Sequence, residues 1–269
     1  MKTSSICLLS AAAALLACYG TPVAAATKQV NCDRGQSLRS AIDKAHGTAG
    51  PIEIFVKGTC EEDIAIGRDY VIIDGAGEAT IVGRVRISEA RGVRLRNLTV
   101  TGPRDGVLVS LGGSVLLQSV NLVDNDSNGL RLRRQSFARL NNCVVEGNGA
   151  DGVAIEQSTL DAQSSSFSGN DQRGIEADVG SSAIVRESEL SGNSGGGVSL
   201  SLHSVAEIRD ESLIIGNGAY GAHLAADSGL RLGPGVEFFD SIDCDDQESS
   251  FADEGAVLTG PVACSTFDE

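Results

Sequence analysis

The sequence has no tryptophan, and aromatic residues make up only 4% of its 269 positions. Beyond residue 26, Tyr70 and Tyr220 are the only aromatic residues with a hydroxyl group. The sequence therefore offers few side chains for a site that recognises sugars by stacking them on aromatic rings.

Other signatures are missing as well. After residue 26 no apolar run approaches the ~20 residues of a membrane-spanning helix. The cysteines show neither the CxxC nor the Cys/His spacing of a zinc site, and no GxxxxGK[ST] loop occurs. The sequence therefore predicts no transmembrane segment, no structural zinc site of that kind and no phosphate-binding loop of that type.

Positive charge is scarce, because the sequence has 21 lysines and arginines but 36 acidic residues, which gives a net charge of −15. Such a field repels polyanions, so we expect no nucleic acid partner. An anionic polysaccharide could approach only with a cation as bridge or along a locally basic strip.

The amino terminus has the features of an export signal. Lys2 precedes an apolar run over residues 6–17 that is too short to span a bilayer, and Ala24-Ala25-Ala26 offers a cleavage site. We expect residues 1–26 to be removed and residues 27–269 to form one secreted or periplasmic domain. Alternatively, the tetrapeptide LLAC resembles a bacterial lipoprotein box and would place a lipid anchor on Cys18.

Five cysteines lie outside this leader, and in an exported chain they are disulfide candidates. Cys32 and Cys60 bracket the amino-terminal segment, Cys244 and Cys264 bracket the tail, and each pair would stabilise its end by ~3 kcal/mol. Cys143 lies within a repeat, where we expect a small buried apolar side chain rather than a reactive thiol.

A glycine recurs every 22 to 24 residues through the middle of the chain, and an asparagine precedes it by four residues. The glycines are Gly106, Gly129, Gly152, Gly174, Gly197 and Gly221, and the asparagines are Asn125, Asn148, Asn170, Asn193 and Asn217. We expect the glycines to supply a positive φ at a turn. We expect the asparagines to bond locally and to tolerate the left-handed region.

Apolar and polar residues alternate on both sides of each glycine. A repeat this short can bury its apolar face only against its neighbours, which predicts a coil of stacked parallel strands over about residues 50–240. A short amphipathic helix over residues 37–45, with Ser37 as N-cap, is expected to cap its start. Residues 241–269 are expected to form an acidic tail closed by the second cysteine pair.

The repeats DNDSNGLRL, GNGADGVAI, GNDQRGIEA, GNSGGGVSL and GNGAYGAHL resemble rungs of the pectin-lyase-like right-handed parallel β-helix. The segment SLRSAIDKA and the strands after it are similar to the helical cap and first rungs of that superfamily. The resemblance covers about residues 30–240. It implies an all-β fold, a single-stranded right-handed parallel β-helix (solenoid) with a short amino-terminal capping helix.

This resemblance leaves the activity open, because the superfamily includes polysaccharide lyases, hydrolases, epimerases and members with no known activity. The paired aspartates and the HG and RIK-like motifs of its polygalacturonases are absent, as is the Asp-Pro-His motif of its mannuronan epimerases. No catalytic set therefore transfers to this sequence residue by residue.

Stacking the repeats by their glycines brings six charged or titratable side chains onto one outward face. Candidate catalytic acids and bases are Glu176, Asp178 and His223. Candidate substrate-binding residues are Arg131, Arg133 and Glu156. Clustered carboxylates could hold Ca²⁺, the one cofactor that the sequence suggests, although no metal ligands are assigned. Charge pairing across a solvated sheet explains the same residues without a function.

Two further groups also have a functional and a structural interpretation. A basic strip could hold an anionic glycan or pair with neighbouring acids; it consists of Arg94, Arg96, Arg139, Arg186 and Arg209. Acids near the turns could bind Ca²⁺ or form ordinary tight turns; they are Asp105, Asp124, Asp126, Asp151 and Asp171.

The sequence thus leaves two functions open. One is an exported β-helix that binds or acts on an acidic polysaccharide, as a lyase or epimerase would. The other is a non-catalytic binding or adhesive scaffold at the cell surface or in the periplasm. The oligomeric state is not predicted.

Overall fold

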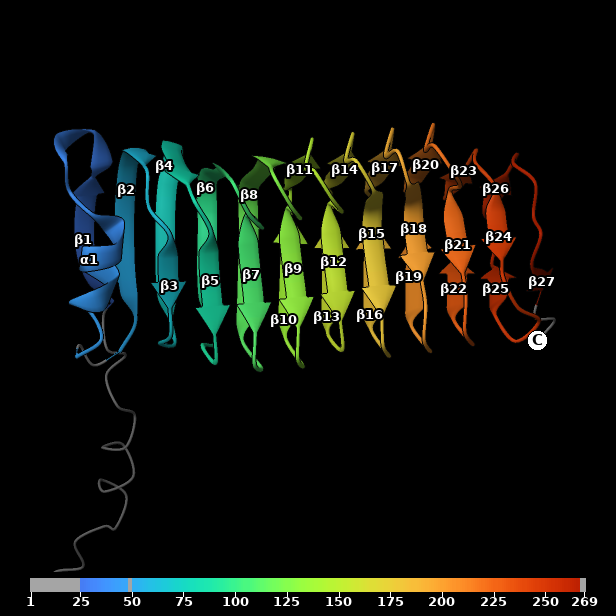
Figure 1. The fold of residues 1–269 in the computed structure, drawn as a ribbon, viewed down its shortest axis with the longest axis horizontal. Helices are drawn as coiled ribbons and strands as arrows, with labels where there is room; N and C mark the ends of the chain where they lie inside the picture. The colour runs from blue at the N-terminus through green and yellow to red at the C-terminus, as the bar shows by residue number, and fades with distance from the viewer. Residues whose placement is uncertain (1–24, 48–49, 267–269) are drawn as a thin grey trace, which may run out of the picture.

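The computed structural model describes residues 25–47 and 50–266, which form a solenoid of about 10 turns of parallel strands (Figure 1). The predicted all-β class and parallel coil are confirmed. The predicted leader falls mostly on residues 1–24, outside the described residues, and so does Cys18. Within the described ranges, no helix is long and apolar enough to cross a membrane.

One wall of the solenoid is a nine-stranded sheet with one short strand from each turn. Its strands are β3 (Ile64–Ile66), β5 (Val85–Ser88), β7 (Val107–Ser110), β9 (Leu130–Arg133), β12 (Val153–Glu156), β15 (Arg173–Asp178), β18 (Gly196–Leu200), β21 (Ala222–Leu224) and β24 (Ile242–Cys244). Every pairing between neighbouring strands is parallel.

The remaining strands form an eighteen-stranded sheet that bends around the rest of each turn. Its first strands are long: β1 (Ala26–Asn31), β2 (Ile52–Cys60), β4 (Val71–Val82), β6 (Val93–Gly102) and β8 (Ser114–Asn125). Later turns divide this strand in two, as β10 (Phe137–Asn141) and β11 (Val144–Glu146), β13 (Thr159–Gln163) and β14 (Ser166–Ser168), β16 (Ser182–Arg186) and β17 (Glu189–Ser191), β19 (Val205–Arg209) and β20 (Leu213–Ile215), β22 (Gly229–Leu232) and β23 (Glu237–Phe238), and β25 (Ser250–Asp253) and β26 (Val257–Leu258), followed by β27 (Ser265–Thr266). The division coincides with a left-handed residue such as Asn142, Ser164 or Glu187.

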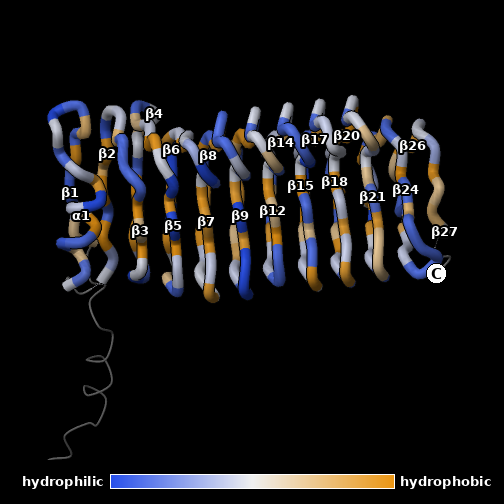
Figure 2. Tube along the Cα trace, viewed as in Figure 1, coloured by the Kyte–Doolittle hydropathy of each residue, from blue (hydrophilic) through white to orange (hydrophobic). Residues whose placement is uncertain are grey.

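The core is a set of apolar columns that run along the solenoid. Figure 2 shows hydrophobic and hydrophilic residues alternating along the strands. The residues that directly follow the repeating glycines form one such column and are each at most 1% exposed: Val107, Leu130, Val153, Ile175, Val198 and Ala222. Because every rung contributes the same positions, the core is continuous from the capping helix to the last turns.

Both ends are closed by features that the sequence predicts. Helix α1 (Leu38–Asp43) begins after Ser37, whose Oγ accepts a hydrogen bond from the Ser40 amide at 3.0 Å. A 3-10 turn, η1 (Cys32–Arg34), precedes it. Disulfides join Cys32 to Cys60 and Cys244 to Cys264. The tail extends the solenoid beyond residue 240, because β24, β25 and β26 pair with the strands of the preceding turn.

We expect reduction of the two disulfides to destabilise the protein by ~3 kcal/mol for each loop that opens. Thermal unfolding with and without reductant measures this loss. The bonds close segments with sequence separations of 28 and 20 residues, while Cys143 is a buried free thiol. Burial raises the pKa of Cys143 to about 11, so this thiol should resist alkylation until the protein unfolds. An unchanged unfolding temperature after full reduction would contradict the prediction.

The recurring asparagines have a different role from the one we expected. None of them adopts a positive φ, and their amides form a buried ladder along the solenoid. Each side-chain Nδ2 donates to the Oδ1 of the next asparagine at 2.8–2.9 Å, from Asn125 to Asn217. Asp240 ends the ladder by accepting from Asn217 Nδ2 at 2.9 Å. The asparagines therefore bond between turns and not locally.

The recurring glycines also differ from the expectation, since none has a positive φ. They are required by close approach instead. A Cβ on Gly129 would lie 2.8 Å from the Gly152 carbonyl oxygen and 2.9 Å from Asn148 Nδ2. The glycine interval thus marks where consecutive turns pack most tightly around the asparagine ladder.

Candidate functional site

The outward face of the nine-stranded sheet carries the predicted site residues. The register aligns Arg131 with Ala154, Ala154 with Glu176, and Glu176 with Ser199, in one outward column. A second column aligns Arg133 with Glu156 and Glu156 with Asp178. The glycine interval therefore predicts the neighbours on this face correctly.

A third polar column lies where these strands begin, at the residue just before each repeating glycine. It consists of Asp105, Asn128, Asp151, Arg173, Gly196 and Tyr220. Its members bond from turn to turn: Asn128 Nδ2 donates to Asp105 Oδ1 at 2.9 Å, and the Arg173 amide donates to Asp151 Oδ1 at 3.0 Å. The buried Asp151 carboxyl is thereby fixed beside the sheet.

Asp151, Arg173 and Glu176 form a charged group on this face. Arg173 forms ion pairs with Glu176 and, at 3.5 Å, with Asp151. The Asp151 side chain is 5% exposed and that of Glu176 is 34% exposed, so one carboxyl is buried and the other faces solvent.

Both carboxyl groups hold a proton more tightly than usual. Burial raises the pKa of Asp151 against the opposing charge of Arg173. Burial and the charge of Asp151 raise the pKa of Glu176. Arg173 contacts both groups, and the charge of Asp151 raises the pKa of Glu176, so the two carboxyls form a pair whose protonation is linked. Such a pair can both donate and accept a proton.

Tyr220 and His223 lie together two turns beyond Arg173 and Glu176. The Tyr220 ring lies against Gly196, where an added Cβ would lie 2.2 Å from the Cε2 atom of the ring. The His223 ring is 5.1 Å from that of Tyr220, and His223 Nε2 lies 3.0 Å from Asp245 Oδ1. The site thus presents a carboxyl pair, a guanidinium, a phenol and an imidazole on one face.

The family model for a right-handed β-helix region matches residues 83–233, more than half of the chain. The chain belongs to the right-handed β-helix family. A search of curated proteins found no sequence match.

Solved β-helix structures share this architecture. An alginate lyase from Paenibacillus sp. str. FPU-7 is similar with a TM-score of 0.62 and 13% identity, over 90% of this chain and 99% of the lyase. Pectate lyase Pel9A is similar with a TM-score of 0.58 and 14% identity, over 91% of this chain and 79% of the lyase. The enzymatically active domain of tailspike protein 2 of bacteriophage CBA120 has a TM-score of 0.53 and 11% identity, over 80% of this chain and 41% of that one. At these identities the likeness shows the fold alone.

In this β-helix, the structure brings only some of the predicted site residues together. Glu176 is coupled to Asp151 and Arg173, which the sequence did not place with it. Asp178 instead accepts hydrogen bonds from the Val179 amide and the Ser201 hydroxyl, both at 2.8 Å. Asp178 therefore positions the turn after β15, although its charge also raises the pKa of Glu176.

The other predicted residues flank the carboxyl pair. His223 faces Tyr220 and Asp245 rather than Glu176. Among the described residues, Arg131, Arg133 and Glu156 form no ion pair, and the charge of Arg131 lowers the pKa of Asp151 against the larger effect of burial. The position before the repeating glycine is polar in most turns, which marks Asp151 and Arg173 in the sequence but does not show that they act with Glu176.

The basic strip on the eighteen-stranded sheet is mostly paired. Arg139 and Arg186 both contact Asp161, and Arg209 contacts Glu207 at 3.2 Å. Arg96 contacts Glu53 and Asp74. These pairs support the structural interpretation of the strip.

Metal ligation is poorly supported by the side chains that the structure describes. Their single grouping with metal-ligand spacing is Cys32, Cys60 and Glu62. Its two cysteines form a disulfide and offer no thiolate. Asp105 is engaged with Asn128, Ser127 and Arg84. No residue set for Ca²⁺ is therefore assigned.

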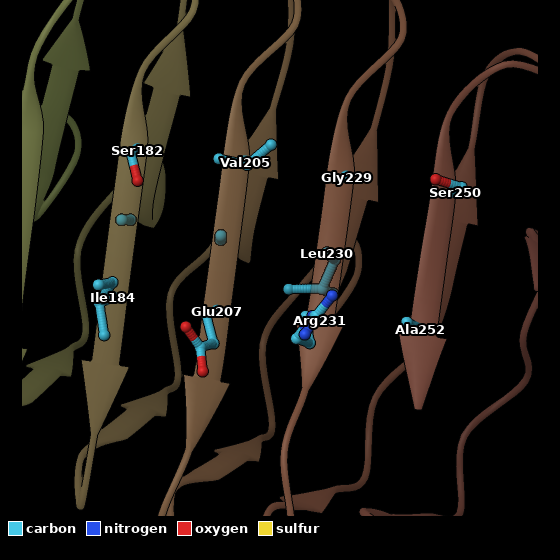
Figure 3. A pocket seen from close by; sticks show the side chains of 11 residues that line it. Ser182, Ile184, Val205, Glu207, Gly229, Leu230, Arg231, Ser250 and Ala252 are labelled. Carbon is cyan, nitrogen blue, oxygen red and sulfur yellow. The ribbon is translucent and has the colours of Figure 1, made fainter. Parts of the chain in front are cut away.

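A hollow of about 400 Å³ lies on the eighteen-stranded sheet and is lined by Ile184, Val205, Glu207, Gly229 and Arg231, among others (Figure 3). Its two charged groups are each paired, Glu207 with Arg209 and Arg231 with Glu254. The hollow has no coupled acid and base, so the candidate site remains the Asp151–Glu176 face.

The carboxyl pair predicts a specific pH dependence for Glu176→Gln. Both pKa values are raised in the folded protein, so folding binds protons, and the pair's contribution to stability grows as the pH falls from neutral through the folded pKa values. The variant loses part of that gain. The free energy of unfolding of the variant minus that of the wild type should therefore be larger at pH 7 than at pH 5. Urea unfolding at both pH values measures this difference. If the difference in unfolding free energy between variant and wild type were the same at both pH values, the raised pKa values of the pair would be contradicted.

Proposed function

We propose that this protein is an exported β-helix whose nine-stranded face binds an acidic polysaccharide and transfers a proton on it, as a lyase or epimerase does. The observation that carries the proposal is the Asp151–Glu176 pair, with raised pKa values, near Arg173 and near Arg131, which has no ion-pair partner in the part of the chain that the structure describes. Two disulfides are consistent with an exported protein. The lyase names of two structural neighbours agree with this substrate class but do not establish it.

The chemistry assigns separate tasks to these groups. Arg173, which contacts both carboxyls of the pair, binds the carboxylate of the reacting uronate and stabilises the negative charge that develops on it, while Arg131 binds another charged sugar two turns away. The ionised oxygen of the carboxyl pair removes the proton from the carbon that bears this carboxylate. In a lyase the bond to the glycosidic oxygen at the adjacent carbon then breaks, a carbon–carbon double bond forms, and the proton held by the pair passes to the leaving oxygen. In an epimerase a proton returns to the opposite face instead.

Removal of the carboxyl pair tests the proposal. On a panel of alginate, pectate and glycosaminoglycans, with and without Ca²⁺, we expect Glu176→Gln and Asp151→Asn to lower turnover by about 10³-fold. Turnover is measured as unsaturated product for a lyase and by proton NMR of the chain for an epimerase.

The matched control is Glu146→Gln, because Glu146 is an exposed carboxylate on β11, away from this face. It should leave turnover unchanged. If the wild-type protein binds a glycan of the panel but converts none, the enzyme proposal fails and the protein is a binding scaffold. If it neither binds nor converts any, the polysaccharide proposal fails as a whole.

A further inference from the structure

The outward column that leads to Glu176 alternates between charged and apolar residues from turn to turn. Starting at β5, it reads Arg86, Leu108, Arg131, Ala154 and Glu176, and each pair of neighbours is aligned in the strand register. Neighbouring strands are ~4.8 Å apart, so Arg86 and Arg131 repeat at ~10 Å along the solenoid.

These arginines are available for a ligand. Among the described residues, neither Arg86 nor Arg131 has a carboxylate at ion-pair distance, whereas Arg84, just before β5, is paired with Asp105, and Arg173, at the start of β15, is paired with Asp151. Arg133 is also unpaired, but it lies on the same strand as Arg131. It therefore adds positive charge to the turn that carries Arg131 and does not place charge on another turn. Positive charge on this face is therefore concentrated on every second turn.

The turns between them are unsuited to an anionic group. Leu108 is 8% exposed and Ala154 is half-buried, and neither can hydrogen-bond a carboxylate. A carboxylate held over Leu108 would lose water without gaining a partner. The apolar C–H face of an uncharged sugar has no such cost and packs well on an aliphatic side chain.

We infer that the site takes a polysaccharide with a disaccharide repeat, in which a negatively charged sugar alternates with an uncharged one. This inference rests on the proposed function and specifies its substrate. The chain lies along the solenoid axis, because an extended pyranose unit is close in length to the spacing between turns. Charged sugars then contact Arg86 and Arg131, uncharged sugars contact Leu108 and Ala154, and the next charged sugar reaches Glu176.

Binding of matched oligosaccharides tests this register. The probes are a hexasaccharide of alternating glucuronate and N-acetylglucosamine, and hexasaccharides of polymannuronate and polygalacturonate, measured by calorimetry at physiological salt. We expect the wild-type protein, and the Glu176→Gln variant, to bind the alternating probe at least tenfold more tightly than either homopolymer. The higher charge of the homopolymers favours the opposite order if the face is only a nonspecific basic patch.

A charge placed between the two arginines should change the preference. Leu108→Arg puts a guanidinium on every turn from β5 to β9, so we expect it to bind the homopolymers more tightly than the alternating probe. Gln163→Arg adds the same charge on the other sheet and should change the affinity neither for the homopolymers nor for the alternating probe. Equal or tighter binding of a homopolymer by the wild-type protein overturns the alternating register but leaves the proposed function standing. Absence of binding to all three probes overturns both.

Discussion

Replacing Asn170 with alanine is expected to lower the free energy of unfolding by about 4 kcal/mol, the cost of leaving several buried polar groups without partners. The Asn170 amide lies at the centre of the ladder and is fully buried. Its Nδ2 donates to Asn193 Oδ1 at 2.8 Å and to the Val145 carbonyl at 3.3 Å. Its Oδ1 accepts from the side chain and the backbone amide of Asn148, at 2.8 and 3.1 Å.

Each of those partners would be buried without a substitute, because the alanine methyl group can neither donate nor accept. Urea unfolding followed by circular dichroism measures the loss. The matched control is Asn121→Ala, since Asn121 is an exposed asparagine on β8, and its replacement should change stability by no more than about 0.5 kcal/mol. Equal effects of the two variants would show that the ladder contributes nothing beyond an ordinary surface amide.

Gly129→Ala is expected to be similarly damaging, by about 3 kcal/mol or more, because overpacking a rigid core forces the backbone to move. The added Cβ would lie 2.7 Å from Val145 Cγ1, 2.8 Å from the Gly152 carbonyl oxygen and 2.9 Å from Asn148 Nδ2. Two of these three contacts are with groups that the strand register and the ladder hold in place. The clash cannot be relieved by rotating one flexible side chain.

Substitutions at two other glycines serve as controls, because they separate the effect of close approach on stability from the effect of backbone conformation. Gly180 has a φ of +66° and open space around its Cβ position, so Gly180→Ala should cost about 1 kcal/mol through the left-handed conformation alone. Gly67 has neither constraint, and its replacement should be neutral or slightly stabilising. If Gly129→Ala cost no more than Gly180→Ala, tight packing between turns would not explain the repeating glycine.

The ladder shows how a periodicity can be read correctly and explained wrongly. Asn148 and Gly152 recur at the right interval, and the interval is enough to predict stacked turns and the neighbours on each face. Their backbone angles, however, depend on where the turn bends, and the sequence pattern does not specify that. The left-handed positions fall instead on residues such as Gly147, Gln157 and Val179.

A second periodic feature was missed for a related reason. Buried serines also bond from turn to turn, as in the Ser158 amide donating to Ser181 Oγ at 3.3 Å and the Ser165 amide donating to Ser188 Oγ at 3.0 Å. Serine is common at exposed turns, so its recurrence alone does not indicate burial. Cys143 occupies the start of one such series, and its amide donates to Ser165 Oγ at 3.1 Å.

By itself, the sequence determined the stacked coil, its capping helix and the neighbours of Arg131, Glu156 and Glu176, because a glycine at the same place in every repeat sets the strand register. Only the tertiary structure decided which of these side chains act together. Asp151 lies just before the repeating glycine, and nothing in its spacing shows that its buried carboxyl pairs with Arg173, which also pairs with Glu176. Proton affinity depends on such burial and on distances between side chains, and these arise only when successive turns are packed against one another.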